Sequence, residues 1–396
     1  MEMITVSEAK RLVRNHTGRI GPVRAPIPKS LGLTLSNDVT SPVDIPSFPQ
    51  SSMDGYAFAH DSLTNHDSLK VVGTVAAGSD ETPVVRVGQA VRIFTGAPLP
   101  EGADTVVMQE KCTRIGDLLT LAHLPAKGEN VRQPGSEAAK GTLALAAGQT
   151  MTPVGIGFLS GLGLTEVEVH PMPSVSILVT GDELAEPGTT LGFGQVYESN
   201  SRSLTAALEQ MGVFRIRKAA SRDDLRSLST ALAAELEASD LVLLTGGVSV
   251  GDRDHVLPAT RECGVEQIFH RVRQKPGKPL FFGTYDGKPV FGLPGNPASV
   301  LTCFYEYVTL AIDLLSSRRD TLRACMATLE GTVRKPAGLT HFLKALHADG
   351  RVRVLDGQES YKLNAFSRAN CLVVLDEERT LYEAGERVET HHLPLQ

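Results

Sequence analysis

A short apolar run followed by a glycine-rich loop constrains the fold of this chain more than any other stretch. It reads LVLLTGGVSVGDRDH and covers residues 241–255. The apolar run, Leu241 to Leu244, lies between helical patterns and ends in turn residues, which is typical of a buried strand in a parallel sheet. Ligands of such sheets bind outside the carboxyl ends of the strands. Glycines there let the backbone approach a ligand and direct N–H groups toward an anion.

Two acids, Asp252 and Asp254, close this loop, where carboxylates are suited to hold a metal ion or a proton. A second interpretation is an ordinary strand-to-helix turn with solvated acids, because a glycine-rich loop alone is a weak signal.

The surrounding chain alternates strands and helices from Ser174 onward. Strands are expected at 174–179, 214–219 and 289–292, with helices beginning near 199, 221 and 298. This alternation predicts a doubly wound α/β domain. Three loops follow strand ends in this domain and are therefore expected on one rim of the sheet: 180–183, 245–254 and 293–299.

Both flanks of this domain carry β patterns. Residues 24–49 are rich in proline and should be extended, and short strands with turns follow up to about residue 140. From about Thr321 the strands return as a small β domain. The predicted organisation is an N-terminal linker with β-rich subdomains, an α/β domain and a C-terminal β domain, with bounds at 1–172 (β subdomain about 46–140), 173–318 and 319–396.

Composition excludes several classes of protein. The 396 residues carry a net charge of −6, which argues against a general nucleic-acid binder. The five cysteines are odd in number and form no CxxC pair, so neither a disulfide framework nor a zinc site is expected, and a reducing cytoplasm fits. The N-terminus does not read as a signal peptide, and no membrane segment is expected. The pair His391-His392 near the end of the chain gives no functional signal.

The expected rim carries groups suited to phosphate chemistry. Its acids suit Mg²⁺, which takes a few carboxylates and keeps waters or phosphate oxygens as its other ligands; they are Asp182, Glu183, Asp223, Asp252 and Asp254. For Asp223 and Asp224 helix capping is the stronger interpretation, since Ser221-x-x-Asp224 resembles a capping box. Lys275 and Lys278, held by prolines, suit an oxyanion or form an exposed basic loop. Gly295-Asn296 before a helix fits an anion site or an ordinary helix start.

Seven motifs occur in an order and spacing that resemble one known family. They are SSMDGYAF, IFTGAPLPEGADTVVMQE, VTGDEL, QVYESNS, TGGVSVGDRDH, KPGKPLFFG and GLPGNPAS. They resemble the molybdopterin molybdenumtransferase family, which comprises MoeA and the E domain of gephyrin-like proteins, and the resemblance covers essentially the whole chain. It implies a molybdopterin-binding α/β domain, N-terminal β-rich subdomains and a C-terminal β barrel.

The resemblance also implies an activity and partners. The enzyme would insert molybdenum from molybdate into adenylylated molybdopterin with Mg²⁺ assistance and release AMP. It would be an elongated homodimer whose cleft is shared between protomers, with the DGYA and TGAPLP loops of one facing the α/β and C-terminal domains of the other. Molybdopterin adenylyltransferase and other proteins of molybdenum cofactor synthesis would be its partners.

Family roles fall on matching positions of this sequence. Asp54, Thr95 and Glu183 would line the cleft around the pterin and the reacting groups. Asp223 and Asp254 would face Mg²⁺ and the phosphates, and Gly246, Gly247 and Ser249 would contact phosphate. The molybdate pocket would be shaped by Lys275, Lys278, Pro294, Pro297 and Ser299, with Ser360 reaching in from the C-terminal domain.

Three departures from the family pattern leave a second function open. RQPGSE at 132–137 stands where the family reads RRxGED, with Glu137 in place of the aspartate. Lys344 stands where the family has a molybdate-contacting arginine, and lysine lacks the bidentate fork. YESN at 197–200 replaces YDSN. The alternatives are a non-catalytic or specialised molybdopterin-binding paralogue or scaffold, and a different nucleotide or phosphate hydrolase on the same α/β domain, against which the full-length match argues.

Overall fold

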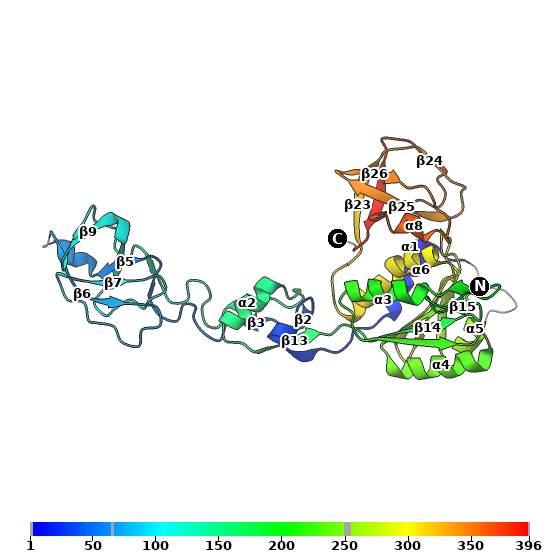
Figure 1. The fold of residues 1–396 in the computed structure, drawn as a ribbon, viewed down its shortest axis with the longest axis horizontal. Coiled ribbons are helices and arrows are strands. Elements are labelled where there is room, and N and C mark those ends of the chain that lie inside the picture. The colour runs from blue at the N-terminus through cyan, green and yellow to red at the C-terminus, as the bar shows by residue number, and fades with distance from the viewer. Residues whose placement is uncertain (1–2, 65–66, 249–254, 395–396) are drawn as a thin grey trace. The chain divides into compact units, whose positions relative to one another are not determined.

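The computed structural model describes residues 3–64, 67–248 and 255–394 (Figure 1). The contacts within the chain divide it into two compact units, each described here by itself. Unit 1 comprises Met1–Arg24, Gly32–Ser36 and Glu168–Gln396, and unit 2 comprises Ala25–Leu31 and Asn37–Val167.

A six-stranded sheet forms the centre of unit 1, in the order β17-β14-β18-β22-β21-β19. Its strands are β14 (Val175–Thr180), β17 (Ile216–Ser221), β18 (Leu241–Thr245), β19 (Glu266–His270), β21 (Phe281–Tyr285) and β22 (Lys288–Leu293). The first four strands in this order are parallel, and β21 and β19 add an antiparallel edge. The predicted α/β domain is confirmed, and the apolar run at 241–244 is its central strand.

Successive side chains of the central strands enter two different cores, because neighbouring residues of a strand point to opposite faces of a sheet. Leu241 and Leu243 pack into one core, and Val242 and Leu244 into the other. Helices cover both faces, as Figure 1 shows for α3 and α6 on one side and α4 on the other. These helices are α3 (Asn200–Gln210), α4 (Leu225–Ala238), α5 (Val256–Glu262) and α6 (Pro297–Cys303).

A single long helix runs from α6 through a π-helical turn, Phe304–Val308, into α7 (Thr309–Leu315). Within the described residues this helix, Pro297–Leu315, is the one stretch long and apolar enough to cross a membrane, but 89% of its apolar window is buried inside the protein. It is therefore the core helix of unit 1, consistent with its fully buried aromatic residues Phe304 and Tyr307.

A buried charged cluster ties the first helix, α1 (Val6–His16), to this long helix. The carboxylate of Glu306, in the π turn, is buried and accepts hydrogen bonds from Lys10 Nζ at 2.6 Å and from His391 Nδ1 at 2.7 Å. Burial alone would raise the pKa of Glu306, but Lys10 and His391 outweigh burial and hold this pKa below its usual value.

The N-cap of α1 is Thr5, whose hydroxyl accepts a hydrogen bond from Glu8 N.

A closed five-stranded barrel follows the long helix, as the resemblance to the family implied. Each strand pairs with two others in the cycle β25-β26-β23-β29-β27. Its strands are β23 (Arg323–Leu329), β25 (Thr340–Ala348), β26 (Arg351–Val354), β27 (Cys371–Leu375) and β29 (Arg387–His392). A short strand, β20 (Gln274–Lys275), pairs in parallel with β25 and so joins the KPGKP segment to the barrel. The remaining elements of unit 1 are β2 (Thr34–Leu35), β15 (Leu184–Ala185), β16 (Val196–Tyr197), β24 (Val333–Arg334), β28 (Leu381–Tyr382) and α8 (Leu363–Phe366).

Unit 2 is built around its own six-stranded sheet, in the order β8-β5-β7-β6-β10-β9. These strands are β5 (Gly55–Phe58), β6 (Leu69–Val75), β7 (Gln89–Ile93), β8 (Thr105–Met108), β9 (Cys112–Ile115) and β10 (Leu118–Leu121). Shorter elements complete the unit: β3 (Val39–Thr40), β4 (Gln50–Ser51), β11 (Val131–Arg132), β12 (Leu143–Leu145), α2 (Pro153–Gly161) and 3-10 turns at Ile27–Lys29, His60–Thr64 and Gln109–Lys111. The chain passes between the units along β1 (Val23–Pro26) and β13 (Glu166–His170).

Candidate active site

The carboxyl ends of three parallel strands meet at one rim of the central sheet. β14 pairs with β18, with Val179 opposite Thr245, and β18 pairs with β22, with Thr245 opposite Leu293. The loops that leave these strands therefore begin side by side, which confirms the predicted common rim. The order of the strands also reverses between β14 and β18, the kind of position where ligands of doubly wound sheets bind.

A cavity of about 880 Å³ opens beside this rim in unit 1. Seven of the residues predicted to form the site line it: Glu183, Lys275, Lys278, Pro294, Pro297, Ser299 and Ser360. Its volume lies within the range of small-molecule sites. The structure thus brings together segments that are up to 177 positions apart, from Glu183 to Ser360.

Buried side chains fix the backbone of the loop that carries Lys275 and Lys278. Gln274 is buried, and its Nε2 donates to the carbonyls of Pro276 and Gly277 at 3.1 and 3.2 Å. Its Oε1 accepts from the hydroxyl of Tyr307. Gly277 has a φ of +87°, and a β carbon there would lie 2.5 Å from Cys303 Sγ, so only glycine fits. Lys275 and Lys278 thus stand exposed on a fixed backbone.

The start of the long helix is joined to a loop of the barrel domain. Asn296 Nδ2 donates to Ser360 Oγ at 2.9 Å, and Ala298 N donates to Ser360 O at 3.0 Å. Asn200 Nδ2 donates to Gly295 O at 2.9 Å from the start of α3. The other side-chain atom of Asn200, Oδ1, is buried and finds no hydrogen-bond partner among the described residues. Since Asn200 lines the cavity, this acceptor is available to a ligand that carries an N–H group.

Lys344 fills a structural position behind this loop. It is 2% exposed, and its Nζ donates to the carbonyls of Gly357, Glu359 and Lys362 at 2.7, 3.2 and 3.1 Å. An ammonium group has three N–H bonds, so these carbonyls use all of them. The prediction that Lys344 contacts an oxyanion stays untested, but in this arrangement Lys344 acts by holding the loop that presents Ser360.

Replacing Lys344 by methionine should therefore loosen residues 357–362. Three carbonyls would lose their donor, and we expect a loss of about 2 kcal/mol in the free energy of unfolding, because an unsatisfied buried acceptor costs about 1–3 kcal/mol. Hydrogen exchange would show faster exchange in this loop. Lys362→Met is the matched control: it removes an exposed ion pair with Glu359 and a contact with the Tyr361 ring, and should change stability by less than about 0.5 kcal/mol. Unchanged exchange in Lys344→Met would contradict this role.

A buried histidine beside Lys275 makes the stability of this region sensitive to acid. His341 pairs with Lys275 across β25 and β20 and is buried. Burial lowers its pKa to about 4, with Lys335 and Lys275 contributing. The unfolded chain, with an ordinary histidine pKa of about 6.5, binds the proton more readily, so stability falls as the pH drops from about 6.5 toward 4.

We expect this group alone to cost about 2 kcal/mol of stability at pH 5 relative to pH 7, because one pKa unit corresponds to about 1.4 kcal/mol. Denaturant unfolding at both pH values should show that the His341→Gln variant loses less unfolding free energy between pH 7 and pH 5 than wild type does. An identical pH dependence in the two proteins would show that His341 does not titrate as described.

The glycine loop after β18 lies close to the neighbouring strand. Gly246 has a φ of +90°, and a β carbon there would lie 2.3 Å from Thr180 O, so the position demands glycine. Gly247 also has a positive φ, of 57°. Residues 249–254 of this motif, which include the predicted residues Ser249, Asp252 and Asp254, lie outside the described residues.

Two acids meet beside this loop at the ends of β14 and β17. Asp182 Oδ1 accepts from Asp223 N at 3.3 Å, and Thr180 Oγ1 donates to Asp223 Oδ1 at 3.5 Å. The N-cap residue of α4 is Asp224, whose carboxylate accepts a hydrogen bond from Ser227 N. The predicted capping role therefore belongs to Asp224. Asp223 does not cap the helix, so its carboxylate is available for another function. The carboxylates of Asp182 and Asp223 and the hydroxyl of Thr180 are oxygen donors of the kind Mg²⁺ takes, so the chemistry of these residues fits a magnesium ion.

The predicted residues of unit 2 also meet. The carboxylate of Asp54 accepts hydrogen bonds from both N and Oγ1 of Thr95, each at 2.8 Å. These bonds hold the pKa of Asp54 below its usual value, so the group is an anion at neutral pH. β4, which precedes Asp54, pairs with β11, which leads into the RQPGSE segment.

A second cavity of about 650 Å³ lies in that segment of unit 2 and is lined by Phe48, Arg132, Ser136 and Glu137 among others. Glu137, predicted to stand in for an aspartate, is exposed on its wall. Its backbone N donates to Ile45 O at 2.9 Å, which fixes the loop without using the carboxylate.

Sequence reasoning missed the residues that hold the site in place. Gln274 and Tyr307 are 33 positions apart and carry no local signal. Glu198, noted only as a departure from YDSN, is the group that caps α3: its carboxylate accepts from Ser201 N and Oγ, both at 2.7 Å. An acidic residue just before a helix is a recognisable signal of a helix start, so this cap could have been predicted from the sequence.

Comparison with known proteins covers nearly the whole chain. Residues 4–163 match the MoeA N-terminal region (domain I and II), residues 176–313 match the probable molybdopterin binding domain, and residues 326–393 match the MoeA C-terminal region (domain IV).

Two curated relatives with the same name match nearly the whole chain. A molybdopterin molybdenumtransferase of Haemophilus influenzae is 35% identical over 363 residues, covering 89% of each chain. One of Staphylococcus aureus is 32% identical over 396 residues, covering 98% of this chain and 94% of its own. Among solved structures, a molybdopterin biosynthesis MoeA protein from Pyrococcus horikoshii has a TM-score of 0.84 at 29% identity and covers 99% of both chains.

Proposed function

This chain belongs to the molybdopterin molybdenumtransferase family, and we propose that its 880 Å³ cavity binds adenylylated molybdopterin and molybdate, inserts the molybdenum and releases AMP. Its place in molybdenum cofactor biosynthesis follows from that membership. The main support for this more detailed proposal is the cavity, which combines two fixed lysines with a buried amide oxygen of Asn200 that has no hydrogen-bond partner in the described part of the chain.

Each part of the cavity suits one part of these substrates. Lys275 and Lys278 supply positive charge for the molybdate oxyanion. Asn200 Oδ1 offers an acceptor to an N–H group of the pterin. The glycines after β18 are on the same rim but outside the residues that line the cavity, and they allow the close backbone approach that a phosphate requires.

Magnesium is part of this proposal. When bound by Asp223 and Asp182, Mg²⁺ would supply charge neutralisation at the phosphate oxygens. This chain's own residues would orient the pterin, hold the oxyanion and enclose the reacting groups. In the proposed reaction, water would attack one phosphorus of the pyrophosphate link and break the P–O bond to the other, so that one phosphate remains on the pterin and the other leaves as AMP. The two dithiolene sulfurs would bind molybdenum in place of one molybdate oxygen, which leaves as water with the two thiol protons.

A genetic rescue tests the assignment. The gene should restore molybdoenzyme activity to a cell that lacks its own molybdenumtransferase, at limiting molybdate. Rescue only at high molybdate would indicate a weakened oxyanion pocket. Failure at every concentration, with folded protein present, would favour the second candidate, a molybdopterin-binding paralogue that does not insert metal, which the altered 132–137 loop motivates.

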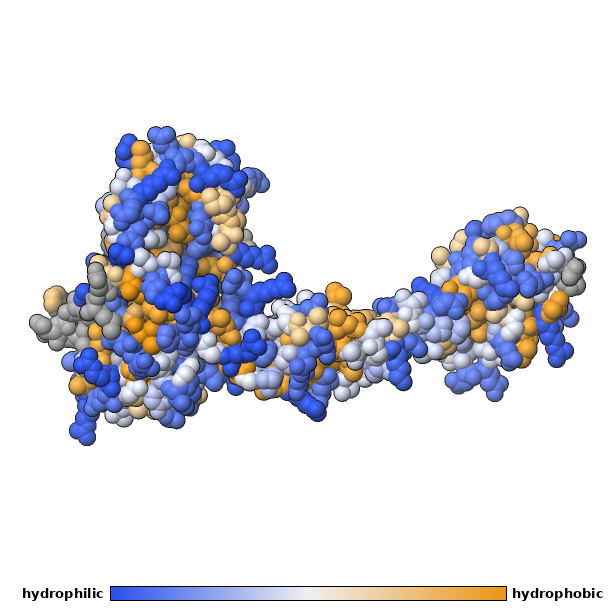
Figure 2. Space-filling view, turned by 180° about the vertical axis from the view of Figure 1, so that it is seen from behind, coloured by the Kyte–Doolittle hydropathy of each residue, from blue (hydrophilic) through white to orange (hydrophobic). Residues whose placement is uncertain are grey.

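We also propose a homodimer in which Asp54 and Thr95 of one copy complete the cavity of the other. Apolar side chains exposed on unit 2 support an interface between copies, namely Leu31, Leu143 and Val154, which are 60%, 57% and 80% exposed. Figure 2 shows apolar surface gathered over the segment that contains α2. Exposed apolar surface of this kind marks interaction sites.

Mixing two inactive variants tests this sharing. Asp54→Asn and Lys275→Ala would each disable every site of their own homodimer, but a mixed dimer would keep one intact site. After unfolding and refolding together, the mixture should regain about a quarter of the wild-type activity. A monomeric mass in solution, or a mixture as inactive as the two separate variants, would contradict the proposal that two copies share the cavity.

A further inference from the structure

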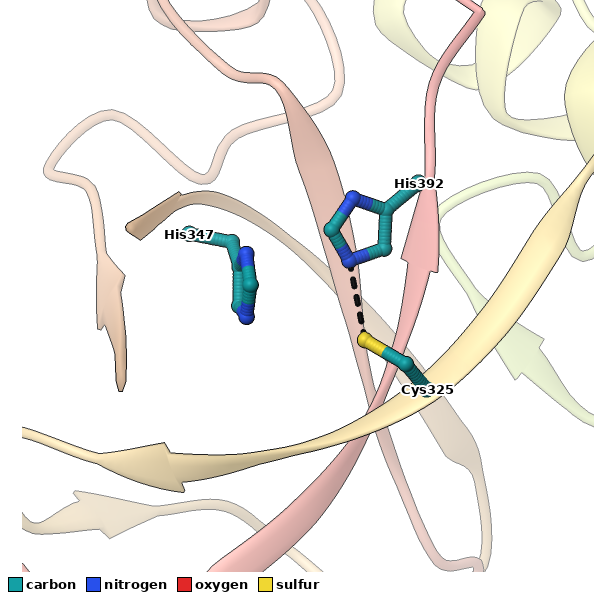
Figure 3. A group of neighbouring side chains, drawn as sticks. All are labelled: Cys325, His347 and His392. Atoms are coloured by element: carbon teal, nitrogen blue, oxygen red, sulfur yellow. Dashed lines mark hydrogen bonds between the residues drawn. The ribbon is translucent and has the colours of Figure 1, made fainter. Parts of the chain in front are cut away.

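Three potential metal ligands meet in the barrel, although the sequence predicted no zinc site. Cys325 lies on β23, His347 on β25 and His392 on β29, and Figure 3 shows their side chains converging. One potential ligand atom from each residue lies within 4.8 Å of those of the other two. Cys325 Sγ is 2.9 Å from His392 Nε2, and the two imidazole rings are in edge contact with centroids 4.6 Å apart.

We propose that Cys325, His347 and His392 bind one zinc ion. A thiolate and two imidazoles are preferred zinc ligands, and a site with three protein ligands keeps a fourth position for water or another ligand. Zinc–ligand distances of about 2.0–2.3 Å in a tetrahedron place ligand atoms about 3.3–3.6 Å from each other. The potential ligand atoms, all within 4.8 Å of one another on strands of one barrel, lie close to this spacing.

The surrounding structure holds the three residues on rigid strands. Asn370 clamps the backbone of His347, accepting from His347 N at 2.7 Å and donating to His347 O at 2.9 Å. Thr390 Oγ1, fully buried, donates to Cys325 O at 3.0 Å and lies 3.1 Å from Cys325 Sγ. Since this hydroxyl has one hydrogen and gives it to the carbonyl, it leaves the sulfur free of a strong donor.

Strand alternation explains why only one histidine of the C-terminal pair belongs to the cluster. Neighbouring residues of β29 point to opposite faces. His391 turns toward Glu306 and Glu389 and is used by the buried charged cluster, whereas His392 turns toward Cys325. Among the described residues that line the 880 Å³ cavity, none belongs to the Cys-His-His cluster, so the two sites can be tested separately.

Cobalt titration of the full-length protein tests the site. After removal of metal by a chelator, Co²⁺ should bind with one equivalent that shows thiolate-to-cobalt charge-transfer absorption, and Zn²⁺ should displace it. Cys325→Ser should abolish this absorption. His347→Gln and His392→Gln should each weaken Zn²⁺ binding by more than the roughly 10- to 100-fold that loss of an outer-shell partner costs. Zinc should also raise the melting temperature of wild type and not of Cys325→Ser.

Two matched variants serve as controls. Cys263→Ser removes a half-buried thiol elsewhere in unit 1, and His123→Gln removes an exposed histidine in unit 2. Both should bind Co²⁺ and Zn²⁺ as wild type does. The absence of thiolate absorption in wild type, or its persistence in Cys325→Ser, would overturn the proposal. A Cys325→Ser protein that keeps the circular dichroism of metal-free wild type shows that any loss is not due to unfolding.

Discussion

Replacing Lys275 and Lys278 together by alanine should lower kcat/KM for molybdate by at least about 100-fold, because each charged hydrogen bond contributes about 1.5–3 kcal/mol and 1.4 kcal/mol is a factor of ten. Both ammonium groups are exposed at the mouth of the cavity. Gln274 and Gly277 hold the loop from below and are not altered, so the backbone should keep its place. Steady-state kinetics of AMP release at varied molybdate measures the effect.

Lys218→Ala is the control for this charge removal. Lys218 is an exposed lysine on β17 of the same sheet and lies outside the residues that line the cavity. Its replacement should leave the KM for molybdate unchanged. A double variant at Lys275 and Lys278 that keeps the wild-type KM for molybdate would show that the oxyanion is bound elsewhere.

Replacing Glu306 by glutamine should lower the free energy of unfolding of unit 1 by about 3–5 kcal/mol, the cost of breaking a buried ion pair. Glutamine has nearly the same shape but carries no charge, so Lys10 and His391 would lose their common counter-charge. Burial lowers the pKa of His391, but Glu306 outweighs it and keeps that pKa raised, and the ring would lose this support. Denaturant unfolding, followed by a signal from unit 1, measures the loss.

Glu389→Gln tests whether burial sets this cost. Glu389 contacts the other nitrogen of the same histidine at 3.0 Å, but its side chain is 51% exposed. An exposed pair contributes less than about 1 kcal/mol, so the control should unfold nearly as wild type does. An equal loss of unfolding free energy in the two variants would mean that the buried carboxylate of Glu306 contributes no more to stability than the exposed carboxylate of Glu389.

Periodicity and turn residues predicted most of the fold. The apolar run at 241–244 followed by glycines defined the central strand, and the alternation around it predicted the neighbouring strands and their common rim. The strands of the C-terminal β domain were also visible in the sequence, most of them as alternating apolar and polar residues and β27 as the apolar run CLVVL. The antiparallel edge formed by β19 and β21 was not predicted, because strand direction within a sheet is not encoded in local periodicity.

Most of the long-range contacts that hold the site residues in place could not be predicted from the sequence. The family resemblance assigns Lys344 to the oxyanion pocket, which stays a prediction, and a lysine in a strand gives no sign that three carbonyls of a loop at 357–362 surround it. The Cys325, His347 and His392 cluster was missed for the same reason. Its members are 22 and 45 positions apart, and only the closed barrel brings their strands together. Long-range proximity of this kind requires the fold.

One measurement tests the central claim most directly. Purified protein is mixed with adenylylated molybdopterin and Mg²⁺, with and without molybdate, and AMP and the metal content of the pterin are measured together. The account predicts AMP release that depends on molybdate, with one molybdenum bound per AMP formed, and its loss in the Lys275 and Lys278 double variant. AMP release that is independent of molybdate, or tight pterin binding with neither product, would contradict the assignment of this cavity to molybdenum insertion.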